Sequence, residues 1–205
     1  MKTATLKVKV TGTVPLVFHN GRLADPLDPW SKKLAELTHK RDKTDADLDE
    51  ISHVEFLGGM YTAEFDGEER VIIPANVIYA TLYKGAKKKK LGVLFKEGVY
   101  IEEDARLIFP DMDKTPEELW NLGYSKQMAV GRCYGHIYPA MVVVQRNRVR
   151  RTRPRFDVWS AEFTIVYYDD ILNESQVKQL VIDAGDRIGF AEDRPKFGRF
   201  SVEFV

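Results

Sequence analysis

The last fifty residues constrain the fold of this chain more than any other segment. Residues 158–168 form an apolar stretch typical of a strand, and Asn173 and Gln176 have the spacing of a helix capping box. A glycine-bounded loop at 189–200 follows the predicted helix, and alternation over 199–205 is typical of a final strand. This order of strand, helix, loop and strand indicates an α+β domain.

The preceding residues contribute further strands and one more core helix. Apolar and polar residues alternate over 4–10, which predicts a strand with one buried face. Pro74 suits the first turn of a helix that ends in a lysine cluster. Additional short strands are predicted at residues 14–18, 60–65, 70–73, 93–95, 99–101 and 106–109, with a tight turn at Asp66 and Gly67 and a short helix from Thr115.

Residues 25–59 differ in character from the strands on either side. The prolines at 26 and 29 exclude regular structure at the start of the segment. A helix is then predicted near Trp30, and Thr44 suits the N-cap of a second helix that ends at Gly59. We therefore expect an inserted helical hairpin.

Together these elements have the order of a ferredoxin-like, or RRM-like, βαββαβ domain. We predict an α+β fold with an antiparallel sheet and two core helices. The chain is short enough to form a single domain over residues 1–205, carrying the helical insertion at 25–59 and a basic β-hairpin at 141–156.

The strongest functional signal is an arginine-rich run at residues 145–156, which carries six arginines and no acid. The chain as a whole has 31 basic and 31 acidic residues, so the positive charge is locally concentrated. Arginine binds phosphate in a bidentate manner and stacks on bases. The run favours contact with a polyanion; the alternative is a solvated hairpin that pairs with acidic segments of the same chain.

Two other segments combine positive charge with glycine or aromatic residues. One is the lysine cluster at the end of the helix that starts near Pro74, and the other is the loop at 189–200. Cations interleaved with phenylalanines are typical of a groove that binds single strands. The candidate nucleic-acid-binding residues are Lys87, Lys88, Arg146, Arg148, Arg150, Arg151, Arg153, Arg155, Phe156, Arg194, Lys196, Phe197, Gly198 and Arg199.

The segment Arg-Pro-Lys-Phe-Gly-Arg-Phe at residues 194–200 resembles the glycine-rich loop that follows the second helix in the RAMP superfamily. That superfamily includes the RNA-binding backbone subunits of CRISPR effector complexes. The resemblance implies a RAMP-type domain whose loop backbone lies close to nucleic acid. It also implies assembly of subunits along the bound strand, with the insertion at 25–59 as a subunit contact.

The chain also resembles a family of small uncharacterised bacteriophage proteins. Residues 11–16, 23–29, 55–61 and 194–200 carry this resemblance, which implies no activity. It implies a location in the cytoplasm of an infected bacterial host. Some RAMP proteins cleave RNA with a histidine or tyrosine, and no residue here matches that role.

Few residues have spacings typical of catalysis or metal binding. The four histidines are scattered, and Cys133 is the one cysteine, which suits a reducing compartment. No run approaches the roughly 20 apolar residues that cross a bilayer, and the N-terminus lacks a signal-peptide pattern. Acid pairs such as Asp111 and Asp113 are more typical of loops than of a magnesium site. We expect no cofactor, no metal and no membrane partner.

We therefore predict a non-enzymatic protein that binds single-stranded DNA or RNA with little sequence preference and forms homo-oligomers. Two alternatives remain open. The first is a phage protein-interaction module, such as a virion or assembly component or an inhibitor of a host CRISPR complex. The second is a RAMP-type endoribonuclease.

Overall fold

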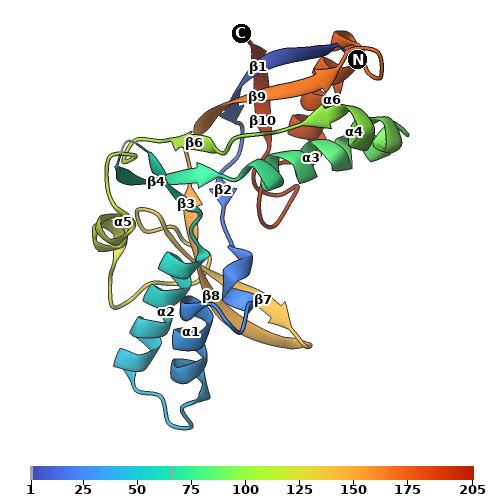
Figure 1. Ribbon diagram of the computed structural model, residues 1–205. Coiled ribbons are helices and arrows are strands. Elements are labelled where there is room, and N and C mark those ends of the chain that lie inside the picture. Colours follow the sequence, from blue (N-terminus) through green and yellow to red (C-terminus); the bar gives the residue numbers. More distant parts are fainter. Residues whose placement is uncertain (1, 66) are drawn as a thin grey trace. The chain divides into compact units, whose positions relative to one another are not determined.

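The computed structural model describes residues 2–65 and 67–205 and divides into two compact units (Figure 1). One unit consists of Met1–Leu16, Ala63–Met112 and Asp157–Val205, and the other of Val17–Thr62 and Asp113–Phe156. Six α-helices and mostly antiparallel strands occur in the described ranges, which confirms the predicted α+β class. The turn predicted at Asp66 falls partly outside these ranges.

The first unit is built on a sheet with the strand order β10-β1-β9-β6-β4-β3, and β5 pairs with β9. β1 is the second strand of this order, with β10 and β9 antiparallel on its two sides. The strands are β1 (Thr3–Gly12), β3 (Thr62–Phe65), β4 (Glu68–Ile73), β5 (Val99–Tyr100), β6 (Ala105–Ile108), β9 (Ser160–Tyr168) and β10 (Phe200–Phe204).

Alternation along β1 decides which face of this sheet is buried. Leu6, Val8 and Val10 are buried, whereas Thr5 and Lys7 are exposed. Helices α3 (Ala75–Lys88) and α6 (Glu174–Arg187) pack against each other, and a Cβ added at Gly85 would lie 3.2 Å from the Cβ of Ala184. The buried stripes of both helices and the buried face of the sheet form the core of this unit.

The strand predicted at 93–95 is wrong, because residues 92–98 form the helix α4 (Gly92–Gly98). A short apolar run has no clear period, so alternation cannot distinguish a strand from a buried helical turn. Phe95 is fully buried within 5.2 Å of the Tyr79 ring centre, so packing against α3 accompanies the helical conformation.

The second unit combines helices with a three-stranded sheet of order β2-β8-β7. The strands are β2 (Leu16–Val17), β7 (Ile137–Val144) and β8 (Asn147–Phe156). The helices are η1 (Gly21–Ala24), α1 (Pro29–His39), α2 (Asp45–Gly59) and α5 (Pro116–Gly123). The predicted helical insertion and the predicted basic hairpin therefore belong to the same unit.

Helix starts follow local sequence closely. Thr44 and Asp47 form a reciprocal capping box at α2, and Asn173 and Gln176 form one at α6. Each box satisfies backbone N–H groups that have no partner inside the helix. Of the helices in the described ranges, none is both long and apolar enough to span a membrane.

Candidate functional site

The arginine-rich run forms one strand of a long β-hairpin. β7 and β8 pair from Ile137 opposite Pro154 to Val144 opposite Asn147. Gln145 and Arg146 make the two-residue turn, with φ angles of 48° and 71°. Positive φ at both turn residues matches the right-handed twist of the strands, so the turn extends the hairpin without splaying it.

The end of the hairpin farthest from the turn is fixed by α2. We call residues 137–140 and 151–156 the basal hairpin. Glu55 of α2 accepts a hydrogen bond from the Arg151 guanidinium at 2.5 Å and one from the Thr152 backbone N–H at 2.7 Å. The Arg155 guanidinium lies 5.1 Å from the centre of the Tyr138 ring. Arginines 151, 153 and 155 therefore contribute to packing within the unit.

Glu55 is a buried acid at this junction, with 4% of its surface exposed. Burial raises the pKa of its carboxyl group, and the hydrogen bonds from Thr152 and Arg151 partly offset the rise. Arg153 is also buried, with 6% exposed. A charge fixed in this way is less available to an external phosphate than a charge on a solvated side chain.

The remaining part of the hairpin, residues 141–150, is solvated. We call this part the distal hairpin. Arg146, Arg148 and Arg150 are all exposed. Facing strand pairs place Arg148 opposite Val143 and Arg150 opposite Met141, so these four side chains share one face. The structure thus separates the predicted arginines into a solvated distal set and a packed basal set.

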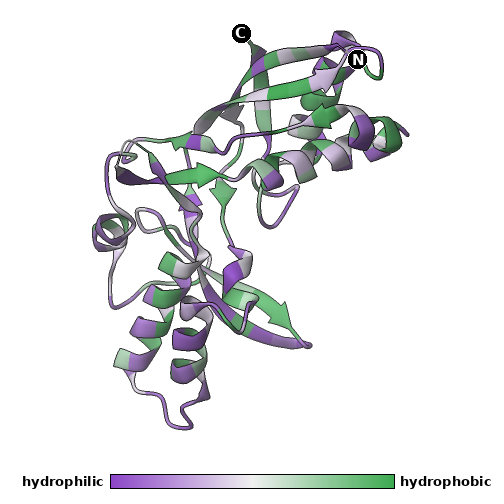
Figure 2. Ribbon diagram, in the orientation of Figure 1, coloured by the Kyte–Doolittle hydropathy of each residue, from purple (hydrophilic) through white to green (hydrophobic). Residues whose placement is uncertain are grey.

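The distal hairpin also exposes apolar side chains that the sequence analysis did not assign to the site. Met141 is 54% exposed, Val143 is 70% exposed and Val144 is 42% exposed. Figure 2 shows the hydrophobic β7 beside the hydrophilic β8. The signal in the sequence is an uninterrupted Met-Val-Val-Val run directly before a turn, where a half-buried strand would alternate.

The lysine cluster belongs to the other unit, at the end of α3. Lys87 lies 5.7 Å from the centre of the Tyr83 ring, and Lys88 is exposed. The neighbouring Lys89 pairs with Asp183 of α6 at 3.2 Å. Cations at a helix C-terminus interact favourably with its carbonyl groups, which accounts for this cluster without a ligand.

The glycine-rich loop is folded back onto the core of the same unit as α3. The N–H of Phe190 donates to the Gly198 carbonyl at 2.8 Å, and the N–H of Gly198 donates to the Pro15 carbonyl at 2.8 Å. A Cβ at Gly198 would lie 2.1 Å from the Phe190 carbonyl oxygen. The glycine is therefore required for contact inside the protein, and its backbone N–H is already bonded.

The cations of this loop differ in exposure. Arg194 donates to the Thr81 hydroxyl at 3.3 Å and is half-buried, whereas Lys196 and Arg199 are exposed. The Lys196 ammonium lies 5.0 Å from the centre of the Phe197 ring. Two cations of the loop thus remain available to solvent.

The phenylalanines that were predicted to stack on bases have no exposed rings. Phe156 is fully buried, and its ring centre lies 5.3 Å from that of Phe18. Phe197 is 6% exposed. Phe200, whose side chain points inward from its strand, stacks on Phe190 with ring centres 4.3 Å apart. In this conformation these rings pack the two cores and offer no face to a base.

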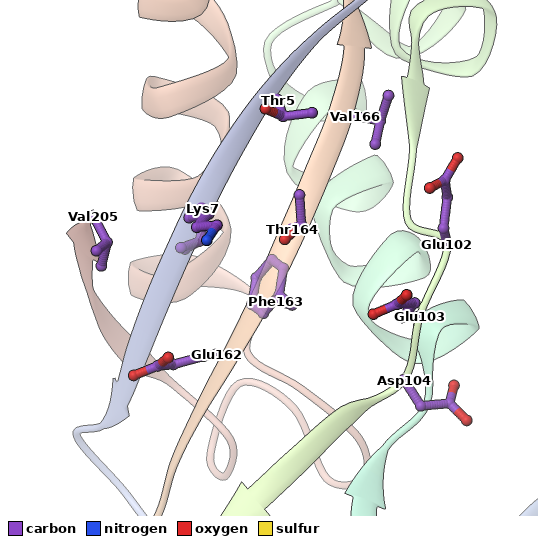
Figure 3. A pocket seen from close by; sticks show the side chains of 11 residues that line it. Thr5, Lys7, Glu102, Glu103, Asp104, Glu162, Phe163, Thr164, Val166 and Val205 are labelled. Carbon is purple, nitrogen blue, oxygen red and sulfur yellow. The ribbon is translucent and has the colours of Figure 1, made fainter.

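A hollow on the sheet of the first unit is lined by acids. It has a volume of about 490 Å³, and Figure 3 shows Glu102, Glu103 and Asp104 beside it, with Glu162 and Lys7 on the neighbouring strands. Negative charge disfavours a polyanion on this face. No group of three or more His, Cys, Asp or Glu side chains that could hold a metal ion occurs among the described residues.

A second groove, of about 790 Å³, lies in the unit that contains the hairpin. Its lining includes Asp45, Asp49 and Trp120, and the Tyr124 hydroxyl donates to the Asp49 carboxylate at 2.9 Å. This groove is also rich in acids, and Arg150 of the distal hairpin lies at its lining. Exposed cations and exposed apolar side chains occur together on the distal hairpin, and also around α4, where Val93 and Leu94 lie near the exposed Lys96.

The chain matches no protein-family model, and a search of curated proteins finds no significant match.

Proposed function

We propose that this protein binds single-stranded nucleic acid, DNA or RNA, through the distal hairpin, with little sequence preference and without catalysis. Arg146, Arg148 and Arg150 would contact phosphates as solvated cations. Met141 and Val143 would lie against bases or sugars. A ligand held in this way is recognised by its backbone charge and its unpaired apolar surfaces, which all sequences share.

One observation carries the proposal: the exposed arginines of β8 share a face with the exposed apolar residues of β7. Arg148 faces Val143 and Arg150 faces Met141 across the strand pair. Met141 and Val143 are exposed by 54% and 70%. A purely solvated arginine hairpin needs no apolar side chains beside its cations.

We also propose a ferredoxin-like topology for the first unit, of the type found in RAMP proteins. The strand order β10-β1-β9-β6 supports it, with α3 lying between β1 and β6 in the chain, after the inserted elements β2 to β4, and α6 lying between β9 and β10. In a ferredoxin-like sheet the first strand lies between the third and fourth, as β1 lies between β9 and β10 here. The proposed nucleic-acid contact does not depend on this assignment.

The direct test is fluorescence anisotropy with labelled single-stranded DNA, single-stranded RNA and duplex DNA over a range of salt concentrations. We expect salt-dependent binding to single strands. The triple variant Arg146→Ala, Arg148→Ala, Arg150→Ala should bind more weakly. Because each phosphate contact on a single strand contributes about 0.7 to the slope of log K against log salt, that slope should fall by about 2.

The matched control is the triple variant Lys32→Ala, Arg41→Ala, Lys43→Ala, which removes three exposed cations of the same unit outside the hairpin. It should retain both the affinity and the salt slope. An absence of oligonucleotide binding in the unaltered protein, or an equal loss in both variants, contradicts the proposal. Survival of a cellular complex after nuclease treatment would then favour a protein partner.

A further inference from the structure

Strand β7 of the distal hairpin lies at the edge of its sheet. Its residues 141–144 lack the features that usually prevent an edge strand from pairing with another chain. The sheet order β2-β8-β7 leaves one side of β7 at the edge. Residues 141–144 read Met-Val-Val-Val, with no charge and no proline. Exposed edge strands of soluble proteins are generally protected by lysine, proline or a bulge, because their open N–H and C=O groups pair with other strands.

The hairpin register identifies the open backbone groups. Val144 and Asn147 close a two-residue turn, so residues 140, 142 and 144 direct their backbone groups toward β8. Residues 139, 141 and 143 direct theirs outward, and the Pro139 carbonyl accepts a bond from the Gly131 N–H on this outer side at 2.8 Å. Within the described ranges, no hydrogen bond involves the outward N–H or C=O of Met141 or Val143.

We propose that β7 pairs with β7 of a second copy of this chain, antiparallel and centred on Val142. Met141 of one copy would exchange two backbone bonds with Val143 of the other, and the symmetric pair would do the same. Such an interface is isologous, as in most homodimers. Over the distal hairpins the result is four adjacent strands, with the two apolar strands inside and the two arginine strands outside.

Charge does not oppose a second copy at this edge, and apolar contact between the valines at 142 and 149 of the two copies favours it. The paired strand segments are neutral, so no side chain must lose a counter-charge when they meet. The arginine strands of the two copies are separated by three strand spacings, about 14 Å. That exceeds the Debye length of about 10 Å at 0.1 M ionic strength, so their repulsion is largely screened. The valines at 142 and 149 of both copies would meet on the face opposite Arg148.

This inference rests on the proposed function, which it deepens. On the face that carries Arg148, each row of side chains across the four strands would be arginine, apolar, apolar, arginine. One such row consists of Arg150 and Met141 of one copy followed by Val143 and Arg148 of the other. A single hairpin has cations on one side only. Pairing would complete a platform in which bases lie along an apolar centre between two rows of cations. Because the paired segment is short, we expect a weak dimer that the ligand stabilises.

The test is disulfide trapping of the full chain in a Cys133→Ser background. In an antiparallel pair centred on residue 142, the two 142 positions are direct neighbours with Cα atoms about 4.5 Å apart. That distance permits a disulfide. Val142→Cys should give a covalent dimer on mild oxidation, and a single-stranded oligonucleotide should increase the yield.

Val144→Cys is the matched control, because its neighbour in the proposed register is residue 140 of the other copy. It should give little covalent dimer. Equal yields from the two variants, or no dimer from Val142→Cys at high protein concentration with and without oligonucleotide, overturn the proposed pairing. Anisotropy on the same samples shows whether oligonucleotide binding itself is present, so the two proposals can fail separately.

A second readout uses the outward N–H of Val143. Val143→Pro removes this donor without removing a bond to β8, whereas Val143→Ala shortens the side chain and retains the donor. Sedimentation should show loss of self-association in the proline variant and partial retention in the alanine variant. Circular dichroism confirms that each variant is folded. Equal self-association of the proline variant and the unaltered protein contradicts the pairing.

Discussion

The distal hairpin and the glycine-rich loop at 189–200 both place cations beside apolar residues, but their surroundings are opposite. Both combine arginine with apolar residues, and both have positive φ angles at their bends. In the loop, backbone hydrogen bonds and the buried Phe190 and Phe197 hold the chain against the core. In the distal hairpin, residues of the same kinds project into solvent. Positive charge with glycine or aromatic residues therefore does not by itself locate a binding surface.

The largest expected effect concerns the glycine of the loop. Gly198→Ala combines a left-handed backbone, with φ of 75°, and a clash with the Phe190 carbonyl. We expect a loss of about 4 kcal/mol in the free energy of unfolding, measured by urea denaturation. Oligonucleotide affinity of the folded fraction should be unchanged.

Gly131→Ala is the control for this substitution. Its φ is 84°, and an added Cβ would have no neighbour within 4 Å. It isolates the cost of the backbone conformation, which is about 1 kcal/mol. Similar losses in the two variants would show that packing against Phe190 is unimportant.

The next effect concerns the junction between α2 and the basal hairpin. Glu55→Ala leaves the Arg151 guanidinium and the buried Thr152 N–H without their acceptor. We expect the free energy of unfolding to fall by about 3 kcal/mol. Glu50→Ala, which removes a more exposed partner of Lys33 from the same helix, should cost less than about 1 kcal/mol. Equal costs would contradict the conclusion that Glu55 is a buried partner that fixes the basal hairpin to α2.

A smaller effect compares two pairs of exposed cations. Arg148→Ala with Arg150→Ala should weaken single-strand binding about tenfold at moderate salt, because two phosphate contacts are lost. Lys196→Ala with Arg199→Ala removes the same charge from the loop and should have little effect on affinity. Both double variants should leave the free energy of unfolding within about 0.5 kcal/mol. A greater loss of affinity in the loop variant would transfer the proposed site to the loop.

The smallest effect is the pH dependence of stability. The pKa of the Glu55 carboxyl is raised in the folded protein, so the folded state binds its proton more tightly than the unfolded state. Stability should therefore fall as pH rises from the ordinary glutamate pKa to the raised value. Glu55→Gln should abolish this fall.

Glu50 provides the opposite case for the same measurement. Its pKa is lowered by the hydrogen bond with Lys33, so its contribution is present above the ordinary glutamate pKa and is lost as pH falls through the lowered value. Urea denaturation across this acid range should show contributions of opposite sign from Glu50→Gln and Glu55→Gln. Contributions of the same sign would contradict the assigned environments.

Local sequence was sufficient to predict most elements of this fold. The capping residues Thr44, Thr115 and Asn173 mark the starts of α2, α5 and α6, because a cap satisfies backbone groups within one turn. Alternation predicted β1 because its pattern is set by one buried face. The helix α4 was missed because its short apolar run depends on contact with α3 and has no period of its own.

By itself, the sequence determined the α+β class, the helix starts and the presence of a basic hairpin, since these depend on neighbours within a few positions. Only the tertiary structure decided which arginines are solvated. Arg148 and Arg151 lie three residues apart on one strand, yet Arg151 meets Glu55, which is 96 positions away in the chain, while Arg148 is exposed. Alternation places Arg148 and Arg151 on opposite faces of β8. Which positions are covered depends on distant contacts, which no local pattern in β8 records.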